Sequence, residues 1–159
     1  MMETLVLGIG NPLLGDDGFG VEVIRRLREQ ADLPDAELLD GGAVGLYLLP
    51  HLEGRSRILV VDAINFGGQP GQVVRLQASE IPARLALKLS EHQVTFHEVL
   101  ALMELMKIKP REFIFIGVQP RSNGWGESLS PEVAAAIPGV IEQVKSQIQI
   151  WRCAAHAVH

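Results

Sequence analysis

Residues 57–64 have the sequence Arg-Ile-Leu-Val-Val-Asp-Ala-Ile, and this stretch decides the fold class. Its continuous run of Ile, Leu and Val is typical of a parallel strand that helices cover on both faces. Upstream, residues 4–9 (TLVLGI) and 36–40 (AELLD) predict two further strands, and downstream 112–118 (EFIFIGV) predicts the last one. The sequence therefore predicts a mainly parallel sheet with 57–64 among its buried strands.

Helical signals lie between and after these strands. Residues 19–30 place their large apolar side chains on one helical face, and residues 46–51 predict a short helix. Residues 95–98 (TFHE) fit a capping box, in which Thr and Glu side chains satisfy backbone donors at a helix start. Residues 130–132 (SPE) predict the start of the C-terminal helix, with a kink or restart at Pro138.

One strand is expected to run against the others. Residues 72–77 follow 57–64 after a short Gly- and Pro-rich loop that has no room for a crossover helix. The predicted fold class is α/β with three layers: a mostly parallel, twisted sheet of about five strands, one of them antiparallel, with helices on both faces. We expect a single domain over residues 1–159, with about 151–159 as a terminal extension.

Composition restricts the class of partner and the compartment. The 159 residues carry 14 Lys and Arg against 19 Asp and Glu, a net charge of −5 without a long run of either sign, which argues against nucleic acid or an anionic membrane. No uncharged stretch approaches the ~18 apolar residues of a membrane helix, and Met1-Met2-Glu3 has no basic flank, so no secretory signal is expected. Cys153 is the only cysteine, which excludes an intramolecular disulfide. We expect a cytoplasmic enzyme or binding domain.

Familiar site templates do not fit this chain. Gly8-Ile9-Gly10 after the first strand suggests a dinucleotide-binding loop, but Leu13 stands at the third glycine position. Asp16 and Asp17 at the next helix start would also repel a pyrophosphate. The GxSxG elbow of hydrolases and the HExxH zinc motif are absent from the sequence.

Three groups from separate loops form the remaining candidate site. In parallel sheets ligands bind beyond the carboxyl ends of the strands, where Asp17, Asp62 and His92 are expected to converge. Two carboxylates and one imidazole suit a borderline divalent cation and leave coordination positions for substrate or water. Both Asp side chains should be ionised near neutral pH and the His largely neutral, so metal contact displaces few protons.

Each member also has a structural interpretation. Asp17 is equally well explained as a helix N-cap or first-turn acid, and a lone loop histidine such as His92 is more often a surface residue than a ligand. Asp62 lies at the end of an apolar strand, where a buried carboxylate is costly without a partner, so a functional role is favoured for this residue.

Five ordered blocks carry a resemblance that runs from about residue 4 to residue 147: GIGNPLLGDDGFGV at 8–21, LDGG at 39–42, VDAI at 61–64, EHQ at 91–93 and GVQP at 117–120. In these blocks the chain resembles the hydrogenase maturation endopeptidases. This resemblance implies a metal-contacting trio at Asp17, Asp62 and His92, which coincides with the three groups above. The family often has Glu where this chain has Asp17. Aspartate is shorter than glutamate by one methylene, so backbone or water must make up the reach of Asp17 to a shared metal.

The resemblance also implies a function. It implies an endopeptidase that removes a short C-terminal extension from the large-subunit precursor of a nickel-iron hydrogenase after nickel insertion. We expect Asp17, Asp62 and His92 to be catalytic and to touch the precursor's own nickel, so that no tightly bound intrinsic cofactor is needed. The alternative is a non-catalytic checkpoint or assembly factor that inspects nickel loading, and a zinc hydrolase of small molecules ranks third.

Further residues receive supporting roles in this hypothesis. Asp16 and Asp40 are candidates for the second shell or for water activation. Asn11 and the Gly41-Gly42 turn are expected to line the substrate channel, because glycine allows close approach of a backbone. The expected partner is the large-subunit precursor, with no nucleic acid and no membrane, and the protein is expected to be a monomer.

Overall fold

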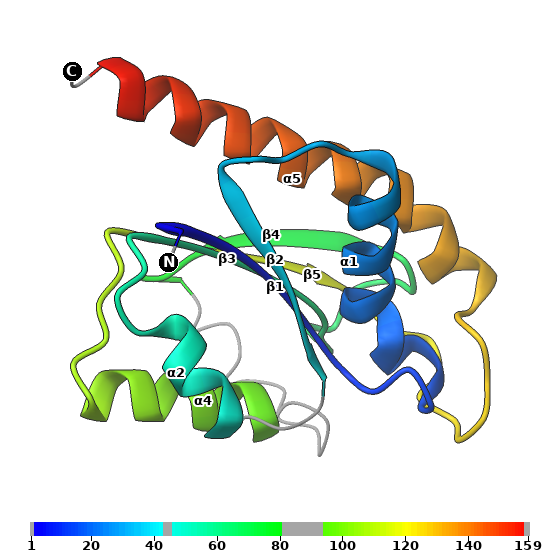
Figure 1. Ribbon diagram of the computed structural model, residues 1–159. Coiled ribbons are helices and arrows are strands. Elements are labelled where there is room, and N and C mark those ends of the chain that lie inside the picture. Colours follow the sequence, from blue (N-terminus) through cyan, green and yellow to red (C-terminus); the bar gives the residue numbers. More distant parts are fainter. Residues whose placement is uncertain (1, 43–45, 81–93, 158–159) are drawn as a thin grey trace.

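The computed structural model describes residues 2–42, 46–80 and 94–157, and it has a five-stranded sheet at its centre (Figure 1). The spatial order is β2-β1-β3-β5-β4, in which β1, β2, β3 and β5 run parallel and β4 runs antiparallel to β5. The strands are β1 (Thr4–Ile9), β2 (Ala36–Gly42), β3 (Arg57–Ala63), β4 (Val73–Gln77) and β5 (Glu112–Val118). The predicted fold class, including the single antiparallel strand, is confirmed.

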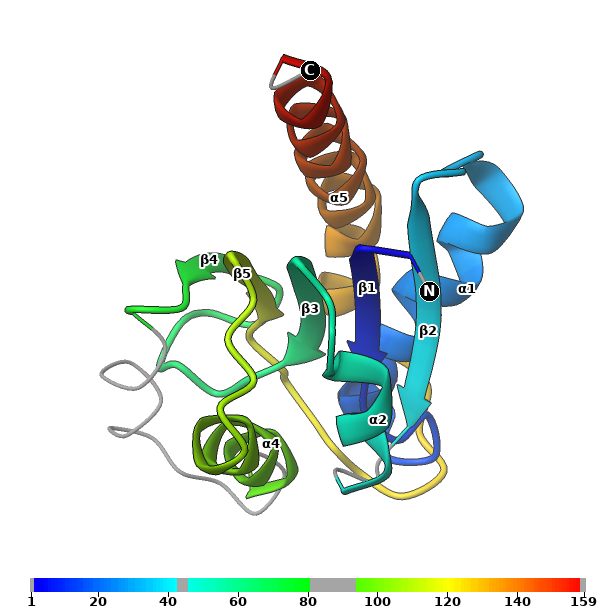
Figure 2. The same cartoon turned by 60° about the vertical axis from the view of Figure 1, so that its left-hand side comes forward.

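Helices cover both faces of the sheet. Helices α1 and α5 pack on one face, and α2 and α4 pack on the other (Figure 2). The helical elements are the 3-10 helices η1 (Gly15–Gly18) and η2 (Leu46–Leu48) and the α-helices α1 (Phe19–Gln30), α2 (Leu49–Leu52), α4 (Val94–Leu105) and α5 (Pro131–Ala157). Within the described ranges, no helix combines the length and the apolar character that crossing a bilayer requires.

The apolar run in β3 is explained by its central position. Leu59 and Val61 face the core under α1 and α5, whereas Ile58 and Val60 face the core under α2 and α4. Because side chains alternate along a strand, a strand covered on both faces must be apolar at successive positions. All four side chains are at most 1% exposed.

Helix α1 lies unusually close to the sheet. A Cβ atom on Gly20 would lie 2.2 Å from the Val61 carbonyl oxygen and 2.6 Å from that of Ile9, so only glycine fits between the helix and the strands. This close packing brings η1, which directly precedes α1, to the carboxyl ends of β1 and β3. The end of the sheet that the sequence predicts as the functional one is built in this way.

The C-terminal helix departs from the sequence-based expectation. Pro138 lies inside α5, which continues through it as one element to Ala157. Trp151, at the expected start of the terminal extension, is 2% exposed and its Nε1 donates a hydrogen bond to Glu112 Oε2 at 2.6 Å. Trp151 therefore belongs to the core, and α5 continues beyond it to Ala157 with mostly exposed residues.

Two expectations cannot be compared with the structure in full. The irregular stretch expected before residue 94, which includes His92, lies outside the described residues, and the capping box of Thr95 and Glu98 depends on side chains of residues 94–99, which are not described. Helix α4 begins at Val94, which places Thr95 inside the helix.

Candidate active site

Asp17 and Asp62 lie together at the carboxyl edge of the sheet. Asp62 is near the end of β3, and Asp17 lies in η1 between β1 and α1. Gly10 is next to both, because a Cβ on it would be 1.8 Å from the Asp17 carbonyl oxygen and 3.7 Å from Asp62 Oδ1. Asp17 is 7% exposed and Asp62 is 5% exposed, so two carboxylates share one nearly buried site.

Asp62 occupies an electrostatically unfavourable position. Burial raises its pKa well above the ordinary value of 3.8, the negative charge of Asp17 raises it further, and a hydrogen bond from the Ala63 backbone opposes the change. Asp62 Oδ1 is buried and has no hydrogen-bond partner among the residues that the structure describes. A buried acceptor near a like charge is costly, and a cation or a donated proton between the two carboxylates removes that cost.

The carboxylate of Asp17 organises the loop that follows β1. Its Oδ2 accepts a hydrogen bond from the Asn11 backbone N at 2.9 Å, and Asn11 Oδ1 in turn accepts one from Leu13 N at 2.9 Å. Helix α1 has Gly18 at its N-cap and no side-chain cap there. Asp17 is therefore not the N-cap of α1, but it does lie in the first turn of η1, as the structural interpretation also allowed.

Asp16 has a different role from its neighbour. It is 0% exposed and accepts four hydrogen bonds: from Arg121 N, Ser122 N, Ser130 N and Ser130 Oγ, at 2.7–3.0 Å. Burial by itself raises the pKa of Asp16, but the backbone bonds from Ser122, Ser130 and Arg121 and the Ser130 hydroxyl bring the net pKa below its ordinary value. These fixed donors occupy the carboxylate, which argues against water activation and makes Asp16 a positioning residue.

Asp40, Gly41 and Gly42 end strand β2 at the same edge of the sheet. Asp40 is exposed, and its Oδ1 accepts a hydrogen bond from Gly42 N at 2.9 Å. A Cβ on Gly41 would lie 2.7 Å from Leu7 Cδ1, so packing within the protein already requires a glycine there. Gly42 has φ +57°, and no atom of the described residues lies within 4 Å of the position that a Cβ would take; its carbonyl accepts a bond from Gly10 N.

Gln119 is a site-organising residue that the sequence analysis did not identify. It is 7% exposed, and its Oε1 accepts bonds from Phe66 N at 2.9 Å and Gly68 N at 3.1 Å. Its Nε2 donates to Asn65 Oδ1 at 3.2 Å. Gln119 therefore holds the loop that leaves β3 just beyond Asp62. The GVQP block contained this residue, but its partners lie more than 50 positions away in the chain.

The third expected metal contact cannot be placed beside the two carboxylates. His92 lies outside the described residues, and within the described ranges no cluster of three His, Cys, Asp or Glu side chains is positioned to hold a metal ion. Asp17 and Asp62 fit two oxygen donors of such a site, because Asp62 Oδ1 is unpartnered and the pair carries like charges. Their roles as catalytic and metal-contacting residues stay a prediction.

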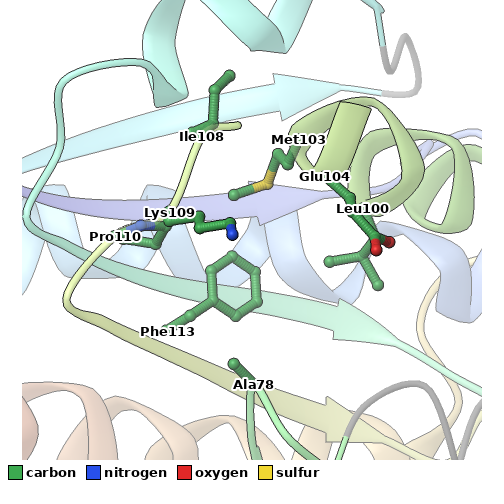
Figure 3. Close-up of a pocket in the computed structure, with 8 residues that line it drawn as sticks. All are labelled: Ala78, Leu100, Met103, Glu104, Ile108, Lys109, Pro110 and Phe113. Carbon is green, nitrogen blue, oxygen red and sulfur yellow. The ribbon is translucent and has the colours of Figure 1, made fainter. Parts of the chain in front are cut away.

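A separate cavity of about 380 Å³ lies between α4 and the sheet (Figure 3). Phe113 lines it from the start of β5, whereas Asp62 pairs with Gly117 near the other end of that strand. Apolar side chains surround most of it, with Glu104 and Lys109 as its charged members. The cavity therefore lies away from the Asp17–Asp62 edge.

Comparison with known sequences gives a consistent match. A family model described as hydrogenase maturation protease matches residues 21–147. The chain is 43% identical over 152 residues to the hydrogenase expression/formation protein HupD of Rhodobacter capsulatus, covering 94% of this chain and 72% of that protein. It is 35% identical over 150 residues to the hydrogenase 2 maturation protease of Escherichia coli, covering 93% and 92%.

Solved structures show the same similarity in three dimensions. The hydrogenase maturating endopeptidase HybD from E. coli superimposes with a TM-score of 0.84 at 35% identity, over 93% of each chain. The [NiFe] hydrogenase maturation protease HybD from Thermococcus kodakarensis superimposes with a TM-score of 0.77 at 30% identity, over 92% of this chain and 99% of that one.

Proposed function

This chain belongs to the hydrogenase maturation protease family and is a peptidase, and we propose that it removes the C-terminal extension of a nickel-iron hydrogenase large-subunit precursor after nickel insertion. The observation that carries the proposal is the buried pair of Asp17 and Asp62, with one unpartnered oxygen and a raised Asp62 pKa. A pair of this kind is suited to receive a cation that arrives with the substrate.

Recognition of the precursor uses its own nickel in this proposal. Asp17 and Asp62 offer carboxylate oxygens, and His92 offers an imidazole nitrogen, to a metal that the precursor already holds. Three protein donors leave coordination positions for groups of the precursor. A precursor without nickel would bring no charge to offset the two carboxylates, which explains why cleavage would follow metal insertion.

Hydrolysis then requires a base and a path for protons. Water adds to the scissile carbonyl carbon, its proton passes to a carboxylate, the C–N bond breaks and the new amine leaves with a proton. Asp17 and Asp62 supply the carboxylate oxygens for this proton; the pKa of Asp62 is raised by burial and by Asp17 while no cation is bound. Nickel in the precursor supplies positive charge beside the carbonyl when it is bound.

The substrate chain is proposed to lie along the loops that end β1 and β2. Asn11 is half-buried, and among the described residues nothing accepts a hydrogen bond from its side-chain amide, which leaves that amide available to a peptide carbonyl. No described residue has an atom within 4 Å of the position that a Cβ on Gly42 would take, which supports a path for a second backbone there. A monomeric state and a cytoplasmic location remain predictions from the sequence.

The proposal is tested by the mass of a purified, nickel-loaded precursor after incubation with this protein. We expect the precursor to lose the mass of its C-terminal extension and the released peptide to appear. A precursor already truncated at the mature C-terminus serves as the control and should keep its mass. An unchanged precursor mass, with binding of the two proteins, would contradict the proposed cleavage and favour the checkpoint role.

A further inference from the structure

Two large apolar side chains are displayed beside the candidate active site. Leu13, in the loop after β1, is 57% exposed, and Trp125, in the loop after β5, is 74% exposed. Both loops leave the carboxyl edge of the sheet and lie side by side (Figure 1 and Figure 2). A backbone hydrogen bond of 2.7 Å from Gly126 N to the Leu13 carbonyl joins them directly.

The loop that carries Trp125 is held in place at both ends by one side chain. The Asp16 carboxylate accepts bonds from Arg121 N and Ser122 N where the loop begins, and from Ser130 N where it ends. Gly126 has φ +74°, a conformation that favours glycine, and this residue follows Trp125 at the loop tip. The backbone of the loop that carries Trp125 is therefore held at both ends, so little backbone entropy is lost when Trp125 binds a partner.

The same two loops are connected to the catalytic carboxylate. Leu13 N donates to Asn11 Oδ1, and Asn11 N donates to Asp17 Oδ2, both at 2.9 Å. Asp16, which closes the Trp125 loop, is the chain neighbour of Asp17. A protein whose cleavage site enters the Asp17–Asp62 edge must pass next to these loops.

We propose that Leu13 and Trp125 form an apolar docking patch for the folded body of the protein substrate, next to its cleavage site. The inference rests on the proposed function. Both side chains are mostly exposed to solvent, so a folded partner that reaches the Asp17–Asp62 edge can cover them. Exposed tryptophan at the centre of a contact is also a frequent source of binding energy, because it buries a large area with few rotatable bonds.

The test compares Leu13→Ala, Trp125→Ala and Ile150→Ala with the unsubstituted protein. Ile150 is the matched control, because it is 56% exposed on α5. With the nickel-loaded precursor as the probe, we expect KM to rise about tenfold or more for Trp125→Ala and several-fold for Leu13→Ala, with kcat changed by less than about twofold. Ile150→Ala should keep both constants, and thermal unfolding should show that all three variants are folded.

The outcomes separate this proposal from the proposed function. If the unsubstituted protein cuts the precursor and all variants share its KM, the docking proposal is wrong and the function stands. A concentration-dependent dimer that Trp125→Ala abolishes, with KM unchanged, would assign the patch to a second copy of the chain and overturn the proposal. If the unsubstituted protein neither cuts nor binds the precursor, both proposals fail.

Discussion

Replacing Asp62 with asparagine is expected to reduce precursor cleavage by about a hundredfold or more, because it removes a charge on which the reaction depends. The amide keeps the shape of the side chain but cannot offer a second negative oxygen to the nickel or accept the proton of the attacking water. The rate of loss of the extension, followed by mass, measures this effect. Asp32→Asn removes the same charge from an exposed position and is the matched control.

The same substitution is expected to make the protein more stable. Asp62 Oδ1 is buried without a partner, and removing the charge should raise the free energy of unfolding by about 1 kcal/mol or more near pH 7. The pKa of Asp62 is raised in the folded state, so the folded protein holds a proton that the unfolded chain has lost above its ordinary value of 3.8. Asp62 therefore lowers the free energy of unfolding increasingly as the pH rises above about 4. Below that pH, the unsubstituted protein and the variant should be equally stable.

Urea denaturation of the unsubstituted protein and of Asp62→Asn, at pH 7 and below about pH 4, measures this difference in the free energy of unfolding. If Asp62→Asn loses activity but gains stability, the Asp62 carboxylate is present for function and not for stability. A Asp62→Asn protein that is less stable at neutral pH, or that cleaves normally, would contradict the role proposed for Asp62.

Asp16→Ala is expected to lower the free energy of unfolding by about 3 kcal/mol at neutral pH, because it leaves several partly buried donors without their charged acceptor. Three backbone N–H groups, of Arg121, Ser122 and Ser130, lose their partner together. Cleavage should fall as well, since Asp17 is the next residue and the loop that Asp16 closes borders the site. Chemical denaturation of the two proteins measures the stability difference.

Ser130→Ala is the graded control for this prediction. It removes the hydroxyl bond to Asp16 and keeps the three backbone bonds, so it should cost only about 1 kcal/mol. Because the pKa of Asp16 is lowered, its contribution is complete above the ordinary value of 3.8 and is lost as the pH falls through the lower folded value. The gap between wild type and Asp16→Ala should therefore stay constant above about pH 4 and narrow below it. If Asp16→Ala and Ser130→Ala lowered the free energy of unfolding equally, the role of Asp16 in holding this loop would be contradicted.

Local sequence patterns were sufficient to predict the sheet and the edge at which Asp17 and Asp62 meet. The apolar run of β3 indicates burial on both faces, and the short loop before β4 indicates that β4 runs antiparallel. Asp62 could be singled out because a buried carboxylate at the end of an apolar strand is costly without a partner. These signals lie within a few residues of the feature that they predict.

The roles of other residues depend on partners that are distant in the chain. Asp16 and Asp17 are adjacent and chemically identical, yet one binds residues 121–130 and the other faces the site. Gln119 and Trp151 are likewise explained by hydrogen bonds to residues 53 and 39 positions away. No local pattern distinguishes such residues from their neighbours, because only the folded topology brings their partners together.

In the proposed mechanism, the nickel of the precursor permits cleavage because Asp17, Asp62 and His92 recognise it. The most direct measurement uses protein that has been stripped with a chelator and then freed of it. This protein is incubated separately with nickel-loaded and nickel-free precursor, and the mass of each precursor is followed with time. The account predicts that only the nickel-loaded form is shortened. Similar rates of cleavage for both forms, or cleavage that appears only after zinc is returned to the protein, would contradict it.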